Sequence, residues 1–241
     1  KPTYGRLSRA GAYLFAASLD HVGPFARDVA DLALAYDALQ GADPDDPVQR
    51  KRAKEPAAAR VSAGVEGLRI AIADDHFARN AVPEALAAAA AAARALNATC
   101  TITIPEAARG RAAATLITMA EGANLHLADL RARPGDFDPL TRDRFLAGAL
   151  LPAHWLSQAQ RARAAYRALA MKVFDEADII LTPATPFAAT PIGQDMIEIE
   201  GERVPLRPAL GAFTQPISLI GLPAMSVPLL GQPHLPIGVQ L

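Results

Sequence analysis

The first sustained hydrophobic pattern along the chain predicts a helix over residues 29–39. Its apolar positions recur three or four residues apart, Asp28 stands where an N-terminal cap is expected, and Gly41 follows the last apolar position. Residues 1–24 have no such period and contain scattered glycines, so we expect turns with short extended pieces there. Residues 42–64 are rich in Asp, Pro, Arg and Lys, which predicts a solvated connector loop.

The next segment has the order strand, helix, strand. A short apolar run from Leu68 to Ala73 predicts a buried strand. Pro83 predicts the start of an alanine-rich helix that ends at about Leu96, and the alternating residues 101–104 predict a second strand. This order and spacing are typical of an α/β crossover between parallel strands.

Two longer apolar stripes predict the next two helices. The first consists of Leu116, Met119, Ala123, Leu127 and Leu130. The second consists of Trp155, Ala159, Ala162, Tyr166, Leu169 and Val173.

The C-terminal third returns to short apolar segments. Asp178–Leu181 predicts a buried strand that ends at Thr182-Pro183, and residues 197–204 predict a hairpin around Gly201. Prolines interrupt the last forty residues, where we expect short strands and turns. The pattern as a whole predicts an α/β fold in which helices cover both faces of a mixed β-sheet, with residues 1–241 in a single domain. The chain starts at Lys1 without a methionine and stops within an apparent strand, so we expect both ends to be cut from a longer protein.

The composition is that of a globular protein. Of the 241 residues 51% are hydrophobic and 20% are charged, and the formal net charge is −1. This balance gives no electrostatic reason to bind nucleic acid or an anionic membrane surface. No apolar stretch reaches the roughly 18 residues that a membrane helix needs, and the start has no signal-peptide pattern. We therefore expect a soluble, cytoplasmic protein that binds neither nucleic acid nor membrane.

Few residues are suited to metal or cofactor chemistry. Cys100 is the one cysteine, so it excludes an intrachain disulfide, and we expect it to be a buried, inert thiol. The acidic pair before His76 is typical of a capping loop rather than of a cation site. No paired ligand spacing occurs among the histidines, which are His21, His76, His126, His154 and His234. Because a glycine-rich phosphate loop is also missing from the sequence, we expect no metal and no cofactor.

The serines do not form a recognisable hydrolase motif by themselves. None lies in a Gly-x-Ser-x-Gly turn. Ser18, Asp20 and His21 are close in sequence, but the members of a catalytic triad normally come from separate segments, so we do not expect a triad here. The residues alone therefore predict a fold and not a reaction.

Several stretches together resemble the amidase signature family of serine amidohydrolases. They are Lys1-Pro-Thr-Tyr-Gly-Arg-Leu-Ser-Arg9, Ser18-Leu-Asp-His-Val-Gly-Pro-Phe-Ala-Arg27, Asp178-Ile-Ile-Leu-Thr-Pro-Ala-Thr-Pro186, Ile220-Gly-Leu-Pro-Ala-Met-Ser-Val-Pro228 and Leu235-Pro-Ile-Gly-Val-Gln-Leu241. The intervening segments resemble the branch of this family that acts on biuret-like and allophanate-like compounds in s-triazine breakdown. These segments are Pro105–Arg109, Glu121–His126, Ala159–Arg161 and Thr214–Ser218.

The resemblance implies a catalytic triad that this chain does not contain. In the family, a lysine base, a serine on a cis peptide and a serine nucleophile act together, and the Gly/Ser-rich signature with both serines comes just before the segment that Lys1 begins. None of the four lysines, Lys1, Lys51, Lys54 and Lys172, matches the catalytic lysine. We therefore assign no catalytic residue, and we expect the 241 residues alone to be inactive.

The resemblance also directs attention to substrate recognition. In related amidases, an arginine on the helix before the Asp-Ile-Ile-Leu-Thr-Pro strand holds a substrate carboxylate, and Arg163 aligns with it. Arg131 is a second candidate, on a helix whose polar side also carries Glu121 and Asn124, while Thr185 and Gln215 lie in proline-bounded loops near the expected pocket. The alternative is that the arginines are solvated helix residues and that the loops serve only as scaffold.

Three functional hypotheses follow. The first is that the chain is the C-terminal portion of an amide hydrolase acting on a small molecule such as 1-carboxybiuret or allophanate, with a small accessory subunit or a second copy as protein partner. The second is a non-catalytic, truncated binding or assembly subunit. The third is an A-type amidotransferase subunit, which would need a partner that handles tRNA; the near-neutral charge gives this hypothesis no special support.

Overall fold

The computed structural model describes residues 1–229 and 235–241, which form two compact units. Unit 1 comprises residues 1–64, 112–162 and 221–223, and unit 2 comprises residues 65–111, 163–220 and 224–241. His234, one of the five histidines, lies outside the described residues. The expectation of a single domain stays a prediction, and each unit is described below by itself.

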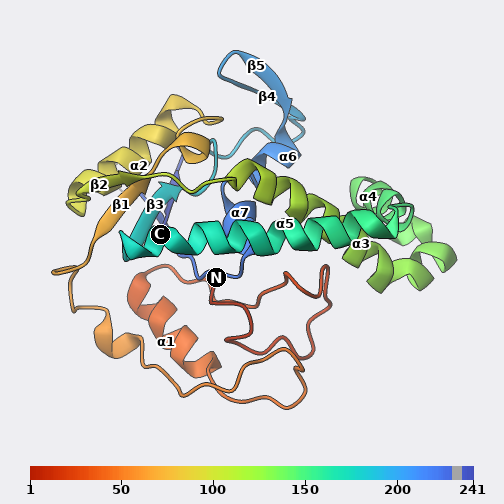
Figure 1. Ribbon diagram of the computed structural model, residues 1–241, viewed down its shortest axis with the longest axis horizontal. Helices are drawn as coiled ribbons and strands as arrows, with labels where there is room; N and C mark the ends of the chain where they lie inside the picture. Colours follow the sequence, from red (N-terminus) through yellow and green to blue (C-terminus); the bar gives the residue numbers. More distant parts are fainter. Residues whose placement is uncertain (230–234) are drawn as a thin grey trace. The chain divides into compact units, whose positions relative to one another are not determined.

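Unit 2 contains a mixed five-stranded sheet with the order β2-β1-β3-β7-β6. Figure 1 labels its strands β1, β2 and β3. The strands are β1 (Ile70–Ala73), β2 (Cys100–Ile102), β3 (Ile179–Pro183), β6 (Ser226–Pro228) and β7 (Gly238–Gln240). β1 pairs in parallel with both β2 and β3, whereas β7 runs antiparallel to β3 and to β6. The predicted crossover is therefore confirmed, and the predicted C-terminal strand lies inside the sheet.

Helices cover this sheet. α2 (Pro83–Ala95) begins at Pro83 as predicted, because the first turn of a helix does not need the missing N–H, and it packs against β1, β3 and β7. Val173 and Ala177, which follow the end of α5 (Ala153–Lys172), pack with Ala71 and Ile102. The mixed α/β sheet with helical cover is thus confirmed, and the expected hairpin is present as β4 (Met196–Ile199) and β5 (Glu202–Pro205).

Unit 2 also contains two short helices that the sequence pattern does not predict, because prolines interrupt it there. They are α6 (Leu206–Leu210) and α7 (Thr214–Leu219), in a region for which only strands and turns are expected from the sequence. Pro208 and Pro216 each occupy the third helical position, where the N–H has no partner within the helix and proline is tolerated. The prediction for this segment was wrong because it treated every proline as a break.

Unit 1 contains helices and long irregular segments. α1 (Val29–Leu39) is capped by Asp28, whose side chain accepts from the backbone N–H of Asp31, as predicted. Residues 1–28 contain no helix or strand, and residues 42–64 contain only the short 3-10 turn η1 (Ala58–Arg60). α4 (Pro139–Ala149) is a helix that the hydrophobic pattern does not predict. Only Phe145 and Gly148 are buried along it, so it has no continuous apolar stripe.

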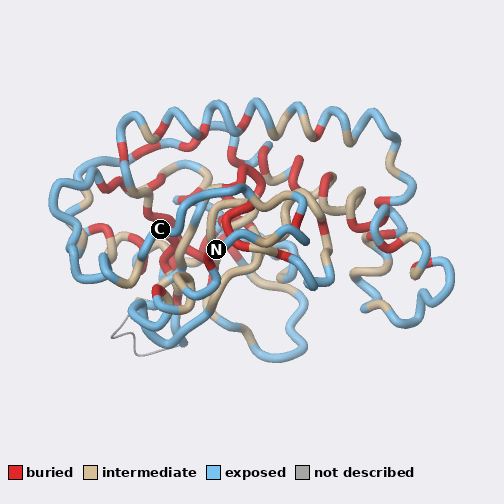
Figure 2. Tube along the Cα trace, turned by 90° about the horizontal axis from the view of Figure 1, so that it is seen from below, coloured by how far each residue is buried: buried red, intermediate tan, exposed pale blue. Residues whose placement is uncertain are grey.

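Two long helices contribute residues to both units. α3 (Ala107–Ala132) and α5 continue through the residue numbers at which one unit ends and the next begins. Buried positions recur on one side of α5, at Ala159, Tyr166 and Ala170, and Figure 2 shows how buried and exposed stretches alternate along the chain. Within the described residues, no helix combines the length and the apolar character needed to cross a membrane.

Candidate substrate-binding site

In unit 2, Arg111 binds the side chain of Gln215, one of the predicted site residues. Gln215 lies in the first turn of α7, and its Oε1 accepts from the Arg111 Nε at 3.0 Å. Arg111 Nη2 also donates to the backbone carbonyl of Pro208 at 2.6 Å. One guanidinium from α3 therefore connects α6 with α7.

Two further arginines, both from α5, bind the other end of α7. Arg163 Nε donates to the carbonyl of Leu219 at 2.7 Å, and Arg167 Nη1 donates to the carbonyl of Ile220 at 2.5 Å. The last carbonyls of a helix have no partner within it and carry partial negative charge, so cationic donors are favourable there. Arg163, predicted as the carboxylate ligand, thus lies half-buried beside the helix that carries Gln215.

Tyr166, between these two arginines in sequence, is buried against α3. Its ring lies so close to Gly110 that a Cβ added there would be 2.7 Å from two ring carbons. The hydroxyl is buried and has no hydrogen-bond partner among the described residues, and burial raises its pKa. Glycine at position 110 is therefore required by close packing.

Thr185 stabilises the loop that follows β3. Its Oγ1 donates to the carbonyl of Phe187 at 2.9 Å, and the buried Pro186 accepts from the backbone N–H of Val82. These contacts fix the loop at the end of a parallel strand, where α/β proteins often place their sites. A substrate contact by Thr185 stays a prediction.

The other three predicted site residues all lie on the part of α3 that belongs to unit 1. Both carboxylate oxygens of Glu121 are bonded to Ser18, one to its backbone N–H at 2.9 Å and one to its hydroxyl at 2.6 Å. Asn124 and Arg131 are exposed. The structure thus gives Glu121 a structural contact with the N-terminal loop, and substrate-binding roles for these three residues stay predictions.

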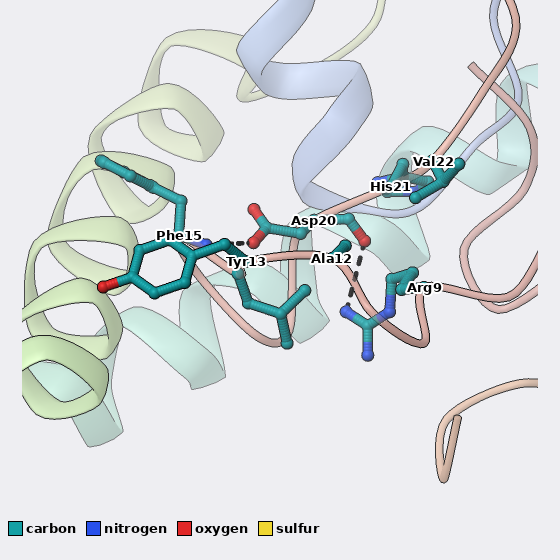
Figure 3. A pocket seen from close by; sticks show the side chains of 8 residues that line it. Arg9, Ala12, Tyr13, Phe15, Asp20, His21 and Val22 are labelled. Atoms are coloured by element: carbon teal, nitrogen blue, oxygen red, sulfur yellow. Dashed lines mark hydrogen bonds between the residues drawn. The ribbon is translucent and has the colours of Figure 1, made fainter. Parts of the chain in front are cut away.

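A pocket of about 250 Å³ is present in unit 1, within the N-terminal loop (Figure 3). Arg9, Asp20 and His21 supply its polar lining. Arg9 Nη1 donates to the carbonyl of Asp20, and the Asp20 carboxylate accepts from the backbone N–H groups of Phe15 and Ala16. These polar groups form hydrogen bonds with the backbone of the same loop, so their contacts stabilise the loop.

His21 is neutral at physiological pH. Burial, and to a lesser extent the positive charge of Lys1, lowers the pKa of its imidazole to about 4. A carbonyl oxygen only accepts, so His21 Nδ1 donates to Leu19 at 2.6 Å, and Nε2 is buried without a hydrogen-bond partner among the described residues. Ser18 and Asp20 use their side chains elsewhere, so the three adjacent residues do not form a triad.

The remaining reactive side chains have ordinary surroundings. Asp74 accepts from Thr103, Asp75 pairs with Arg79, and His76 donates to the carbonyl of Ala212. Within the part of the chain that the structure describes, no group of three or more His, Cys, Asp or Glu could hold a metal ion.

Cys100 corrects one expectation, because it is exposed rather than buried. It is the first residue of the edge strand β2, in which Cys100 and Thr101 are exposed and Ile102 is buried.

Three residues at α7 were not predicted from the sequence. They are Arg111, Arg167 and Gly211, which lies beneath the Gln215 side chain. The spacing of four residues between Arg163 and Arg167 was a usable signal, because such positions share one face of a helix. No sequence pattern connects Arg111 with Gln215, 104 positions away.

Comparison with known proteins adds information that the geometry does not contain. The family described as Amidase matches residues 1–241. AtzE of Pseudomonas sp. (strain ADP), described as a subunit of 1-carboxybiuret hydrolase, is 48% identical over 243 residues, which cover 100% of this chain and 53% of that protein. The A-type subunit of the glutamyl-tRNA(Gln) amidotransferase from Roseiflexus castenholzii (strain DSM 13941 / HLO8) is 32% identical, with 100% and 54% covered.

Solved structures agree with these sequence relatives. A structure described as a vestigial protein complex that reveals the evolutionary origins of an s-triazine catabolic enzyme has a TM-score of 0.96 at 48% identity, with 100% of this chain and 53% of that one covered. A crystal structure of an amidase has a TM-score of 0.83 at 27% identity, with 100% and 52% covered. The chain spans about half the length of these relatives. The match over all 241 residues shows that the chain belongs to the amidase signature family.

Proposed function

We propose that this chain forms the substrate-recognition part of an amide hydrolase that acts on a small carboxylated amide of the 1-carboxybiuret or allophanate type. The support from comparison is the 48% identity, along the whole chain, with a protein of 1-carboxybiuret hydrolysis. The support from the structure is Arg163, which is half-buried and oriented by its bond to the carbonyl of Leu219. That orientation is the single observation on which the carboxylate part of the proposal depends.

A guanidinium suits this role for physical reasons. It stays charged at any physiological pH and carries five N–H donors in a fixed plane, so it can bind a carboxylate with two parallel hydrogen bonds. The bond from Arg163 Nε to the carbonyl of Leu219 limits the rotation of the side chain, so less conformational entropy is lost when the ligand binds.

The reaction itself needs groups that we do not assign to these residues. In the amidase signature family a lysine acts as base, and such a lysine needs a pKa lowered from about 10.4 by burial or neighbouring charge. Burial lowers the pKa of Lys1 to about 8, but Lys1 belongs to the motif that follows the nucleophile, and its Nζ donates to the carbonyl of Leu222. We therefore expect the 241 residues alone not to hydrolyse amides.

Protein partners form a separate part of the proposal. The two sequence relatives described above are each one component of a larger enzyme, a hydrolase in one case and an amidotransferase in the other, and one solved relative is described as a protein complex. We propose a small accessory subunit or a second copy of the chain as partner. A transamidation role with tRNA is the alternative, and it has the lower sequence identity.

Steady-state kinetics test the carboxylate role of Arg163. In the longest protein encoded by the reading frame that contains these residues, Arg163→Ala should raise KM for 1-carboxybiuret or allophanate about tenfold or more, and KM for neutral biuret much less. Arg161→Ala, an exposed arginine on the same helix, is the control and should leave both KM values unchanged. Equal changes for anionic and neutral amides would contradict the carboxylate role.

The same protein tests the reaction class. Release of ammonia from these amides without tRNA supports a small-amide hydrolase. Activity that requires glutamyl-tRNA would instead support the amidotransferase alternative. If the 241 residues alone released ammonia at the rate of the longer protein, our division between recognition and catalysis would be wrong.

A further inference from the structure

The orientation of the Gln215 amide is determined by its partner. The Arg111 guanidinium has donors and no acceptor, so the Gln215 atom that faces it at 3.0 Å must be the carbonyl oxygen. The Nε2 amino group is then directed away from Arg111. This amino group has no hydrogen-bond partner among the described residues, and Gln215 is only half-buried.

Gly211 provides the space that this orientation needs. A Cβ at position 211 would lie 2.7 Å from Gln215 Cδ and 2.8 Å from Nε2, so the amide lies directly over the backbone of Gly211. The φ angle of Gly211 is −88°, which any residue can adopt. Steric space, and not backbone conformation, is therefore what a side chain at position 211 would take away.

The helix that carries Gln215 is held firmly although it is short. α7 has six residues, too few for a stable helix without tertiary contacts. Phe213, Pro216 and Leu219 are fully buried, and the carbonyls of Leu219 and Ile220 accept from Arg163 and Arg167. The Gln215 amide thus starts from a rigid position, which favours specific recognition.

We infer that Gln215 is a specificity-determining residue whose Nε2 donates hydrogen bonds to a carbonyl or carboxylate oxygen of the substrate, and that Arg111 and Gly211 are its positioning residues. The inference rests on the proposed function for the class of ligand, a small amide with several oxygen acceptors. Beyond the proposed function, the inference specifies that Nε2 is the atom of Gln215 that faces the ligand, and that Arg111 and Gly211 determine the direction of the amide.

Three substitutions separate the elements of this arrangement. Gln215→Glu keeps an oxygen for Arg111 and nearly the same shape, but it removes the donor. Gly211→Ala displaces the amide by steric contact without changing its chemistry. Arg111→Lys keeps the charge but loses the planar group that binds Gln215 and Pro208 together. Arg109→Lys is the matched control, because Arg109 lies on the same helix and is exposed.

The kinetic test uses the longest protein of the reading frame with 1-carboxybiuret as substrate. We expect Gln215→Glu to raise KM about tenfold or more, and Gly211→Ala and Arg111→Lys to raise it about threefold to tenfold, with kcat within about threefold of the parent. Arg109→Lys should leave both constants unchanged. Unchanged KM in all three variants, in a protein that hydrolyses the amide, would overturn the inference while leaving the proposed function intact.

A binding measurement decides the matter if the parent protein hydrolyses none of these amides, an outcome that would contradict the proposed function. Malonamate, which carries one carboxylate and one amide, is titrated by calorimetry into the parent and the Gln215→Glu variant at low temperature. Binding that is weakened about tenfold or more in the variant supports the inference. Equal binding by the two proteins, or no binding by the parent, overturns it.

Discussion

The two units solve the problem of backbone hydrogen bonding in different ways. In unit 2 the strands pair with one another, and most buried side chains are apolar, as at Ala71, Leu181 and Phe213. The buried polar side chains of Thr182 and Gln240 bond to each other. In unit 1 the long irregular segments have no strand to pair with among the described residues. Charged side chains provide hydrogen-bond partners for their backbone groups instead. The buried polar and charged side chains of unit 1 are Arg6, Arg9, Gln40, Asp46 and His126.

The contacts of the buried charges show what they do. Arg9 donates to the carbonyl of Ala17, and Arg6 donates to the carbonyl of Ala53. Asp46 accepts from the backbone N–H groups of Arg9 and Val48. Buried backbone groups must find partners, and a chain without regular structure finds them in side chains. Unit 1 should therefore be more sensitive to the loss of one charge, and unit 2 to the loss of apolar volume.

The largest expected effect is from Asp46→Ala. Removal of this carboxylate leaves Arg9 as a buried charge without its ion-pair partner at 3.5 Å and also removes the acceptor for two backbone N–H groups. We expect the free energy of unfolding of unit 1 to fall by about 3–5 kcal/mol. Hydrogen exchange, read separately for the amides of each unit, measures the change.

Two controls define that result. Asp46→Asn keeps an oxygen acceptor but removes the charge, so it should lower the free energy of unfolding of unit 1 less than Asp46→Ala does. Asp136→Ala removes an exposed partner of Arg133 and should cost less than about 1 kcal/mol. A loss from Asp46→Ala no larger than the loss from Asp136→Ala would show that buried charges do not hold unit 1 together.

The second effect concerns the apolar sheet of unit 2. Leu181 on β3 is fully buried, so Leu181→Ala should lower the free energy of unfolding of unit 2 by about 2–5 kcal/mol through the cavity it leaves. Ile192→Ala, at a fully exposed position of the same unit, should change it by less than about 0.5 kcal/mol. If hydrogen exchange changed as much in unit 1 as in unit 2, the two units would unfold as one.

The smallest effect is the pH dependence that His21 gives to unit 1. Its pKa is about 4 in the folded state and about 6.5 when unfolded, so the unfolded chain binds more protons between these values. The free energy of unfolding should therefore fall as the pH is lowered from about 6.5 towards 4. His21→Gln should remove part of the one-proton slope of about 1.4 kcal/mol per pH unit, and only part, because solvent screens a half-buried imidazole. Urea unfolding at several pH values measures the difference, and identical slopes for the two proteins would contradict a lowered pKa.

Much of the fold could be predicted from the sequence, because local patterns carry it. The cap at Asp28, the start at Pro83 and the hairpin around Gly201 each depend on neighbouring residues, and each is confirmed. α6 and α7 were missed because a proline in the first turn of a helix looks the same as a proline that ends a strand. The exposure of Cys100 depends on β2 being the edge strand, which only the order of the sheet determines.

The candidate site was less predictable than the fold. Family resemblance pointed to Arg163, and a proline-bounded loop pointed to Gln215. The structure places Gln215 on α7 and Arg163 on α5, bonded to the last residue of α7. The contact of Arg111 with Gln215 joins residues far apart in sequence, and the space over Gly211 becomes visible only in three dimensions. Glu121 was a candidate from its place on the polar side of a helix; both of its oxygens bind Ser18, and its substrate-binding role stays a prediction.

The exposed edge strand has a practical consequence. Cys100 is the only thiol of the chain, and it is accessible at the rim of the sheet, so a maleimide dye can attach at one defined position. β2 pairs with β1 at this residue, opposite Ala71, so an environment-sensitive dye there would change its fluorescence when these two strands come apart. Cys100 therefore provides an attachment point for a fluorescent reporter on unit 2.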